Sequence, residues 1–125
     1  MAIKTFNKNL YKKPFEAIKS GKKTVEIRAN KKESSENSVN LMKPGDLIIF
    51  TCLDSGERIR CEIERIQLYN SARELLKREG TERTLSSTND IEEGIKSIES
   101  IGNYKELIAK NGVFAIKLKS ISKFY

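Results

Sequence analysis

The amino-acid sequence predicts an α+β fold, a small mixed β-barrel with helices packed outside it. Segments with the apolar pattern of strands are more numerous than a parallel fold of alternating strands and helices would give. The alternation changes phase near residues 64–65, as in strands that bulge or bend to close a barrel. Helical spacing of apolar residues is confined to residues 10–20 and to an insert at 70–110. The 125 residues are expected to form a single domain, residues 1–125.

The first half of the chain predicts four strands around one helix. The strands are expected at residues 3–8, 24–28, 47–53 and 58–69, with turns at 43–46 and 54–57. Apolar residues at helical spacing predict the helix at 10–20, and Gly21 follows it as a left-handed cap. Asp46 is expected to shape its turn. Residues 30–40 are polar and rich in Ser, Asn and Lys, which predicts a mobile loop.

The second half predicts a helical insert, residues 70–110, and one closing strand. Ser71-Ala72-Arg73-Glu74 has the pattern of a capping box, which predicts a helix ending near Gly80. Further helices are expected at 89–101 and, capped by Asn103, up to residue 112. Alternating apolar residues over 113–121 predict the last strand.

Positive charge is concentrated in the first quarter of the chain. The whole sequence has 24 basic and 17 acidic residues, a net charge of +7. Residues 1–32 contain ten basic and two acidic side chains, a net of +8, so the other 93 residues sum to −1. A basic region of this kind favours a polyanionic partner such as RNA. A solvated, lysine-rich surface is the alternative explanation.

The residue types present exclude several classes of site. The sequence has no histidine, which excludes Ser–His and Cys–His nucleophile pairs and most zinc sites. Cys52 and Cys61 lie in apolar, strand-like runs and are expected in the core. We therefore expect no metal and no cofactor. No apolar run approaches membrane-spanning length and residues 1–10 have no signal-peptide pattern, so a cytoplasmic protein without membrane contact is expected.

The candidate functional site is the strand at 24–28 and the lysine before it. Thr24, Glu26 and Arg28 would lie on one face of the strand. This arrangement suits binding to the edge of a nucleobase or of a sugar. Glu26 can accept from an exocyclic amine, and Arg28 can bind phosphate or hold Glu26 in place. Lys23 would stabilise an anion as an ammonium, or act as a base if its proton were lost. The alternative is a solvent-facing strand with an ordinary Glu–Arg pair.

Other side chains are candidates for ligand contact. Lys22 is a second cation beside Lys23. Tyr69 and Tyr104 can stack on bases, although core packing is the alternative. The candidate ligand-binding residues are therefore Lys22, Thr24, Arg28, Tyr69 and Tyr104.

Four segments, in order, resemble the ASCH domain family and together cover nearly the whole chain. They are 14–28 (PFEAIKSGKKTVEIR), 43–50 (KPGDLIIF), 69–76 (YNSARELL) and 111–116 (NGVFAI). The resemblance implies a barrel of the pseudouridine-synthase-associated (PUA-like) type with a cleft beside the strand at 24–28. It also implies RNA or nucleoside handling.

One branch of this family hydrolyses the acetyl amide of acetylcytidine with a lysine, a threonine and a glutamate. The resemblance places the lysine at Lys23, whereas the position of the threonine is occupied by Glu26. The family glutamate falls in the helical insert, where Glu82 or Glu92 would match. Other relatives have been linked to RNA binding or RNA cleavage.

Three functions remain open from the sequence. The first is binding of RNA or a modified nucleoside in a cleft beside the strand at 24–28. The second is a small hydrolase, either an amidohydrolase on acetylated cytidine or a ribonuclease, with Lys23 and Glu26 in catalysis. The third is a protein-binding regulatory domain. The oligomeric state is not predicted.

Overall fold

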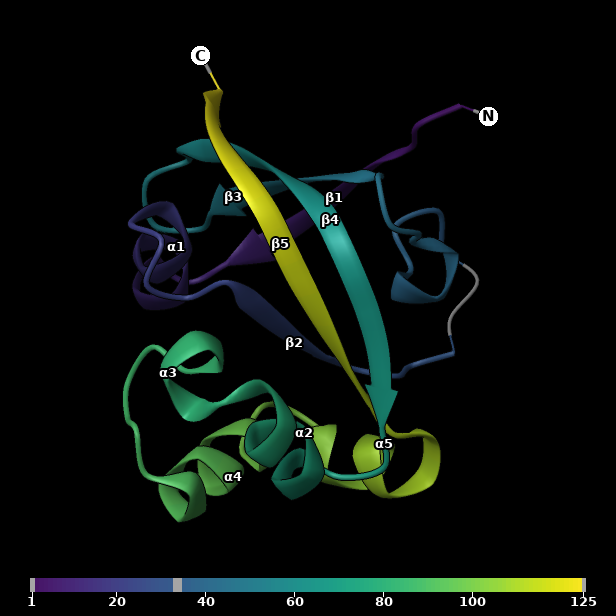
Figure 1. The fold of residues 1–125 in the computed structure, drawn as a ribbon, viewed down its shortest axis with the longest axis vertical. Helices are drawn as coiled ribbons and strands as arrows, with labels where there is room; N and C mark the ends of the chain where they lie inside the picture. Colours follow the sequence, from purple (N-terminus) through teal and green to yellow (C-terminus); the bar gives the residue numbers. More distant parts are fainter. Residues whose placement is uncertain (1, 33–34, 125) are drawn as a thin grey trace.

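The computed structural model describes residues 2–32 and 35–124 (Figure 1). Its strands are β1 (Thr5–Leu10), β2 (Val25–Ala29), β3 (Leu47–Cys52), β4 (Arg58–Tyr69) and β5 (Val113–Phe124). Its helices are α1 (Lys12–Lys19), α2 (Ala72–Glu79), α3 (Thr81–Thr84), α4 (Ile91–Glu99) and α5 (Tyr104–Asn111), with one 3-10 turn, η1 (Val39–Leu41). The predicted α+β class is confirmed.

The strands form one mixed, five-stranded sheet in the order β1-β3-β4-β5-β2. β1 pairs with β3 in parallel, and the other neighbours pair antiparallel. The long strands β4 and β5 cross the molecule together (Figure 1). Their register shifts between Glu62 and Arg65, which confirms the predicted bulge.

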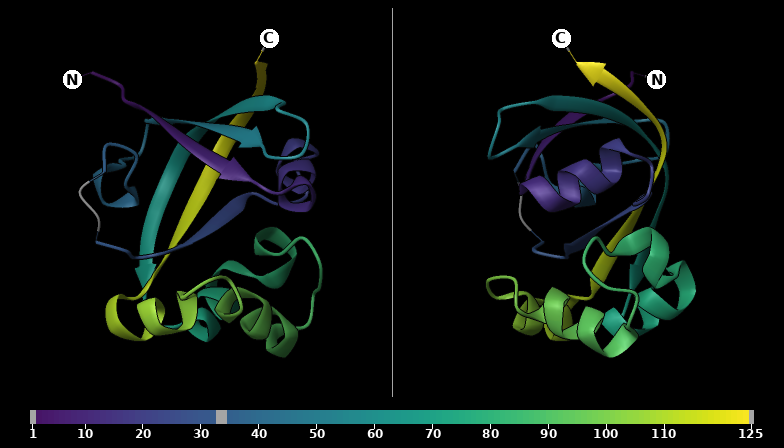
Figure 2. Two further views of the ribbon diagram at one scale, coloured as in Figure 1. Left: turned by 180° about the vertical axis from the view of Figure 1, so that it is seen from behind. Right: turned by 90° about the vertical axis from the view of Figure 1, so that its left-hand side faces the viewer.

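The prediction of a closed barrel is wrong, because the sheet is open. β1 and β2 are its two edges, and no backbone pairing joins them in the described part of the chain. The connection between them is helix α1 rather than a hairpin, so no turn sets a register between the two strands (Figure 2). We call the gap between β1 and β2 the seam. The Arg28 side chain spans it, with Nη2 donating to the Asn9 carbonyl at 3.1 Å.

Apolar side chains are buried in two separate cores. The first lies between the sheet and α1 and contains Phe6, Phe15, Ile18, Ile48, Phe50 and Ile59. The second lies between β2, β5 and the insert helices and contains Val25, Ile27, Leu75, Leu76, Ile98 and Ile108. Helices α2–α5 gather at the end of the molecule where β4 ends and β5 begins (Figures 1 and 2). Cys52 and Cys61 are free thiols buried in the first core, as predicted.

Most predicted helix and turn signals are confirmed. Gly21 has φ +85° after α1, in the left-handed region expected of a cap. Ser71 accepts from the Glu74 amide at 3.1 Å, as the capping box requires. Asp46 accepts from the amides of Lys4 and Lys43 at 3.1 and 2.9 Å and so shapes its turn.

Other details differ from the sequence-based expectations. Asn103 precedes α5 but makes no side-chain cap bond, so that cap prediction is wrong. Helix α3 and the turn η1 were not predicted. The mobility predicted for residues 30–40 stays a prediction, and residues 33–34 of that loop lie outside the described residues. In the part of the chain that the structure describes, no helix is long and apolar enough to cross a membrane.

Candidate functional site

A cavity of about 310 Å³ lies where the seam meets the helical insert, and we call it the seam pocket. Residues from the end of β1, from β2 and from the insert contribute to its lining. Apolar wall residues include Leu10, Pro14, Leu85 and Ile98, and hydroxyl groups come from Ser86, Ser87 and Ser97. Lys23, Glu26 and Arg28 supply the charged part of the lining. The pocket is therefore mainly apolar with one concentrated group of charges, as is usual for small-ligand sites.

The alternation of β2 separates its apolar side chains from its charged ones. Val25 and Ile27 enter the second core, and Glu26 and Arg28 consequently lie on the opposite face of the strand. Glu26 is only 4% exposed and Lys23 only 6%. The alternative of a solvent-facing Glu–Arg pair is therefore excluded.

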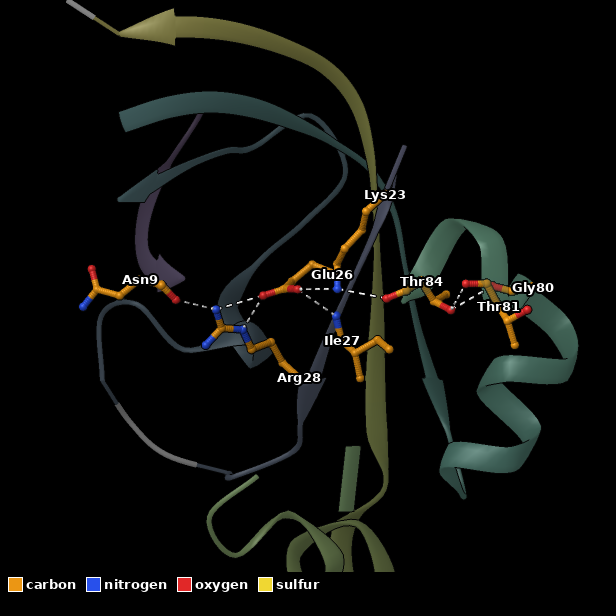
Figure 3. A network of polar contacts seen from close by, with 8 residues as sticks. All are labelled: Asn9, Lys23, Glu26, Ile27, Arg28, Gly80, Thr81 and Thr84. Carbon is orange, nitrogen blue, oxygen red and sulfur yellow. Dashed lines mark hydrogen bonds and ion pairs between the residues drawn. The ribbon is translucent and has the colours of Figure 1, made fainter. Parts of the chain in front are cut away.

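The three charged side chains form a connected network, which we call the seam triad (Figure 3). Glu26 lies between Lys23 and Arg28. Lys23 Nζ is 3.3 Å from Glu26 Oε1 and donates to the Thr84 carbonyl at 2.9 Å. Arg28 Nε donates to Glu26 Oε2 at 2.9 Å, and Arg28 Nη2 lies 2.9 Å from the same oxygen. The Ile27 amide donates to Glu26 Oε1 at 3.2 Å.

These contacts engage both oxygens of Glu26. A carboxylate offers about four lone-pair positions. The Ile27 amide and Nε of Arg28 donate hydrogen bonds to Glu26, and Lys23 Nζ and Nη2 of Arg28 lie within ion-pair distance of its oxygens. A ligand amine at Glu26, as the sequence suggested, would have to compete with these partners. Glu26 holds two cations in place, and both cations line the seam pocket.

Burial and neighbouring charges shift the pKa values of the triad in opposite directions. Burial by itself would raise the pKa of Glu26, but Arg28 and then Lys23 outweigh it and hold that pKa below its ordinary value. Burial opposes the charge on Arg28 too, yet the Glu26 carboxylate raises the pKa of the guanidinium. Burial raises the pKa of Tyr104, with the nearby Arg28 guanidinium opposing the rise. Glu26 and Arg28 are consequently both ionised at neutral pH.

Helix α3 supplies a contact that the sequence analysis did not find. Thr84 is fully buried at the end of this short helix and borders the pocket. Its carbonyl accepts from Lys23, while its hydroxyl donates to the Gly80 carbonyl at 2.8 Å. Figure 3 shows that hydroxyl directed toward Gly80 and Thr81, away from Lys23. Four residues without apolar periodicity leave no sequence signal for such an element.

The structure brings together only some of the residues singled out from the sequence. Lys23, Glu26, Arg28 and Tyr104 all line the seam pocket. The others are not among its lining residues: Lys22, Thr24, Tyr69, Glu82 and Glu92. Lys22 and Glu82 are exposed, and Thr24 is half-buried with its amide bound to the Arg83 carbonyl. Glu92 lies at the surface in an ion pair with Arg73.

Tyr69 belongs to a second polar cluster, which we call the β4–α2 cluster. Its hydroxyl donates to Glu79 Oε2 at 2.5 Å, and the ring is 8% exposed. Arg65 donates to both oxygens of Glu79 at 2.8 Å. Burial, followed by the bond to Glu79, raises the pKa of Tyr69. In this position Tyr69 cannot stack on a base.

Metal binding has no support among the described residues. No group of three Cys, Asp or Glu side chains within residues 2–32 and 35–124 is placed to hold a metal ion. Glu26 and Glu79, whose side chains are each 5% exposed, are each paired with an arginine.

The fold and the pocket define a class: a small α+β domain with an open mixed sheet and a charged pocket at the seam. The chain belongs to the ASCH domain family, whose profile matches residues 9–122. The family resemblance seen in the sequence is thereby confirmed. No curated protein sequence matches the chain.

Several solved structures have a similar fold. The hypothetical protein PH0355 is 31% identical, with a TM-score of 0.74, and the match covers 92% of this chain and 97% of that one. The protein PF0455 from Pyrococcus furiosus is 32% identical, with a TM-score of 0.68 and coverage of 92% and 96%. The ASCH protein from Zymomonas mobilis is 22% identical, with a TM-score of 0.64 and coverage of 94% and 68%. This last similarity concerns the fold alone.

Proposed function

We propose that this protein binds RNA or a modified nucleoside, with one base held in the seam pocket. The observation that carries the proposal is the seam triad at the surface of a cavity of about 310 Å³. That volume lies at the lower end of the roughly 300–1,000 Å³ typical of small-ligand sites. The apolar wall suits the faces of a base, and the cations suit its polar edge or a phosphate.

Hydrogen-bond counting indicates what the pocket would recognise. A lysine ammonium has three N–H groups. Two of those on Lys23 are directed at Thr84 and Glu26, which leaves one for a ligand. Because both oxygens of Glu26 are engaged by neighbouring donors, Lys23 and Arg28 are the charged groups of the lining that would donate to a ligand. We therefore expect the ligand to present acceptors, such as base carbonyl oxygens, ring nitrogens or phosphate oxygens.

Basic side chains continue beyond the pocket. A smaller adjoining depression shares Arg28 and Tyr104 with the seam pocket and is bordered by Lys8 and Lys31. All three cations belong to the basic first quarter of the sequence. A phosphate attached to the bound nucleoside would meet this positive potential, which supports RNA as the ligand.

A small hydrolase is the second candidate, favoured by the presence of Lys23 in the pocket. Lys23 lies beside the Glu26 carboxylate and donates to the Thr84 carbonyl, and as an ammonium it would stabilise an oxyanion. The Thr84 hydroxyl is engaged with Gly80 and is not directed at the cavity. Incubation with acetylcytidine and with single-stranded RNA tests this candidate. Turnover that Lys23→Ala abolishes would support it, and no turnover would reject it.

Binding is tested by fluorescence anisotropy with labelled single-stranded RNA at several salt concentrations. The logarithm of the affinity should fall linearly with the logarithm of salt concentration, because phosphate contacts release counterions. Lys23→Met should weaken binding at every salt concentration, whereas Lys43→Ala, an exposed lysine outside the seam pocket, should have little effect. Undetectable binding of RNA and nucleosides by the wild type would refute the proposal.

A further inference from the structure

We propose that the rim of the seam pocket is a second nucleotide subsite, where Tyr11 stacks on the base next to the one inside the pocket. This inference rests on the proposed RNA binding and extends it from one nucleotide to two. Tyr11 is one of the apolar residues at helical spacing within the helix predicted at 10–20, and it is not among the ligand-binding residues proposed from the sequence.

Exposed apolar side chains are concentrated at this rim. Six large hydrophobic side chains of the described residues are exposed, and three of them line the seam pocket. They are Tyr11 at 74%, Leu53 at 54% and Ile101 at 50% exposure. Large apolar side chains gathered around a cavity mark a binding surface more often than chance exposure does. The rim therefore offers a surface for a flat, partly apolar group.

The backbone under Tyr11 is held on both sides. Before it, Leu10 is the last residue of β1, and the Leu53 amide donates to the Leu10 carbonyl at 2.8 Å. At Tyr11 itself, the carbonyl accepts from Phe15 at 3.1 Å in the first turn of α1. The ring thus projects into solvent from a fixed point between a strand and a helix. Stacking on a ring held in this way costs little additional backbone ordering.

The charges beside Tyr11 favour a nucleotide over an apolar peptide. Lys12 and Lys13 follow directly and are both exposed. Two acidic groups lie near them: Asp54, which accepts from the Lys12 amide at 3.2 Å, and Glu16, one helical turn further along α1. A flat base on Tyr11 would bring its phosphate close to two lysines. Aromatic rings beside basic side chains are the usual arrangement for binding single-stranded nucleic acid.

The test compares ligands of different length on matched variants. Tyr11→Ala, Tyr11→Phe and the control Ile3→Ala are each titrated with ribonucleoside monophosphates and with a short single-stranded RNA of mixed sequence. Ile3 is 68% exposed and precedes β1, whereas Tyr11 follows the same strand, so the control removes a similarly exposed apolar side chain from its other end. Tyr11→Ala should weaken binding of the short RNA about five- to 150-fold. Tyr11→Phe and Ile3→Ala should bind it like the wild type.

Tyrosine emission gives an independent readout. The chain has no tryptophan and four tyrosines, so its intrinsic fluorescence comes from tyrosine. Stacking should quench the Tyr11 contribution when the short RNA binds. The quench should be smaller in Tyr11→Phe, although this variant binds with the same affinity.

The outcomes separate this inference from the proposed function. RNA binding by the wild type that Tyr11→Ala leaves unchanged would overturn the rim subsite alone. An equal loss of monophosphate and short-RNA affinity in Tyr11→Ala would place Tyr11 in the pocket itself and would also overturn it. Failure of the wild type to bind either ligand would refute both.

Discussion

The domain contains two Arg–Glu pairs whose carboxylates have the same side-chain exposure but different partners and surroundings. Glu26 of the seam triad and Glu79 of the β4–α2 cluster each have a side-chain exposure of 5%. Each carboxylate accepts from an arginine and from one further side chain. The further side chain is Lys23 at the seam but Tyr69 in the β4–α2 cluster.

The third partner and the surroundings determine what each cluster can do. Two cations and one carboxylate give the seam triad a net charge of +1, with donors directed toward a cavity. Arginine, carboxylate and neutral tyrosine sum to zero, and that cluster lies outside the seam pocket. The β4–α2 cluster is neutral, its polar groups are hydrogen-bonded to one another, and it joins β4 to α2. The seam triad has excess positive charge at a cavity, which favours a ligand with hydrogen-bond acceptors. Similar local chemistry therefore gives a neutral cluster at one place and, at the other, the positively charged group on which the proposed binding rests.

The largest expected effect is that of Glu26→Gln on stability. The substitution leaves the buried Lys23 and the half-buried Arg28 close together without their shared carboxylate. We expect the free energy of unfolding to fall by about 3–5 kcal/mol, the usual cost of breaking a buried ion pair. Urea denaturation measures the change. A loss below about 1 kcal/mol, within the range of exposed pairs, would contradict the electrostatic description of the triad.

Glu79→Gln should have a smaller effect on stability and none on RNA affinity. Arg65 has a side-chain exposure of 40%, so water can solvate it when the carboxylate is removed. We expect a loss of about 1–2 kcal/mol, from hydrogen bonds to a charged group that are partly replaced by water. The same urea and anisotropy measurements apply. Weakened RNA binding in this variant, once its folded state is verified by circular dichroism, would remove the distinction between the clusters.

The pH dependence of stability should reflect both carboxylates. The pKa of Glu26 and the pKa of Glu79 are lowered in the folded protein, the latter chiefly by its bonds to Arg65. A lowered folded pKa contributes stability above the unfolded value of about 4.5, and this stability is lost as pH falls through the folded pKa. Urea midpoints measured from pH 7 downward should therefore fall in acid. The urea midpoint of Glu26→Gln should depend less steeply on pH than that of the wild type. An equally steep dependence would contradict the prediction.

The smallest effect is expected at the surface pair of Arg73 and Glu92. Both side chains are largely exposed, at 48% and 60%, so the ion pair competes with water and salt. Glu92→Gln should leave the urea midpoint and RNA affinity unchanged within error. This result would argue against a catalytic role for Glu92, which the family resemblance suggested. A loss of turnover or of RNA binding in Glu92→Gln would support that role.

Local patterns predicted much of this domain. The strand alternation, Gly21 after α1 and the Ser71 cap depend on neighbouring residues, and the structure has each of them. The same alternation placed Glu26 and Arg28 on one face of β2. Features that depend on distant residues were not predictable from such patterns.

The open sheet is one such feature, since closure depends on whether β1 and β2 share a register. The Lys23–Thr84 bond joins residues 61 positions apart, and α3 has no periodicity to reveal it. Tyr69 and Tyr104 have similar sequence surroundings as aromatic residues near helix starts, but only Tyr104 borders the pocket. Tertiary packing decides which of these two aromatic side chains lines the pocket.

The most direct test of the central claim is amide chemical-shift mapping of the 14.3 kDa chain with a short single-stranded RNA. We predict that the perturbed amides cluster around the seam pocket, at Ile27, Arg28 and Leu85, while those of Tyr69 and Glu79 in the β4–α2 cluster stay unchanged. Perturbations centred on the β4–α2 cluster, or none at all at RNA concentrations that saturate comparable domains, would contradict the assignment of the seam pocket as the binding site.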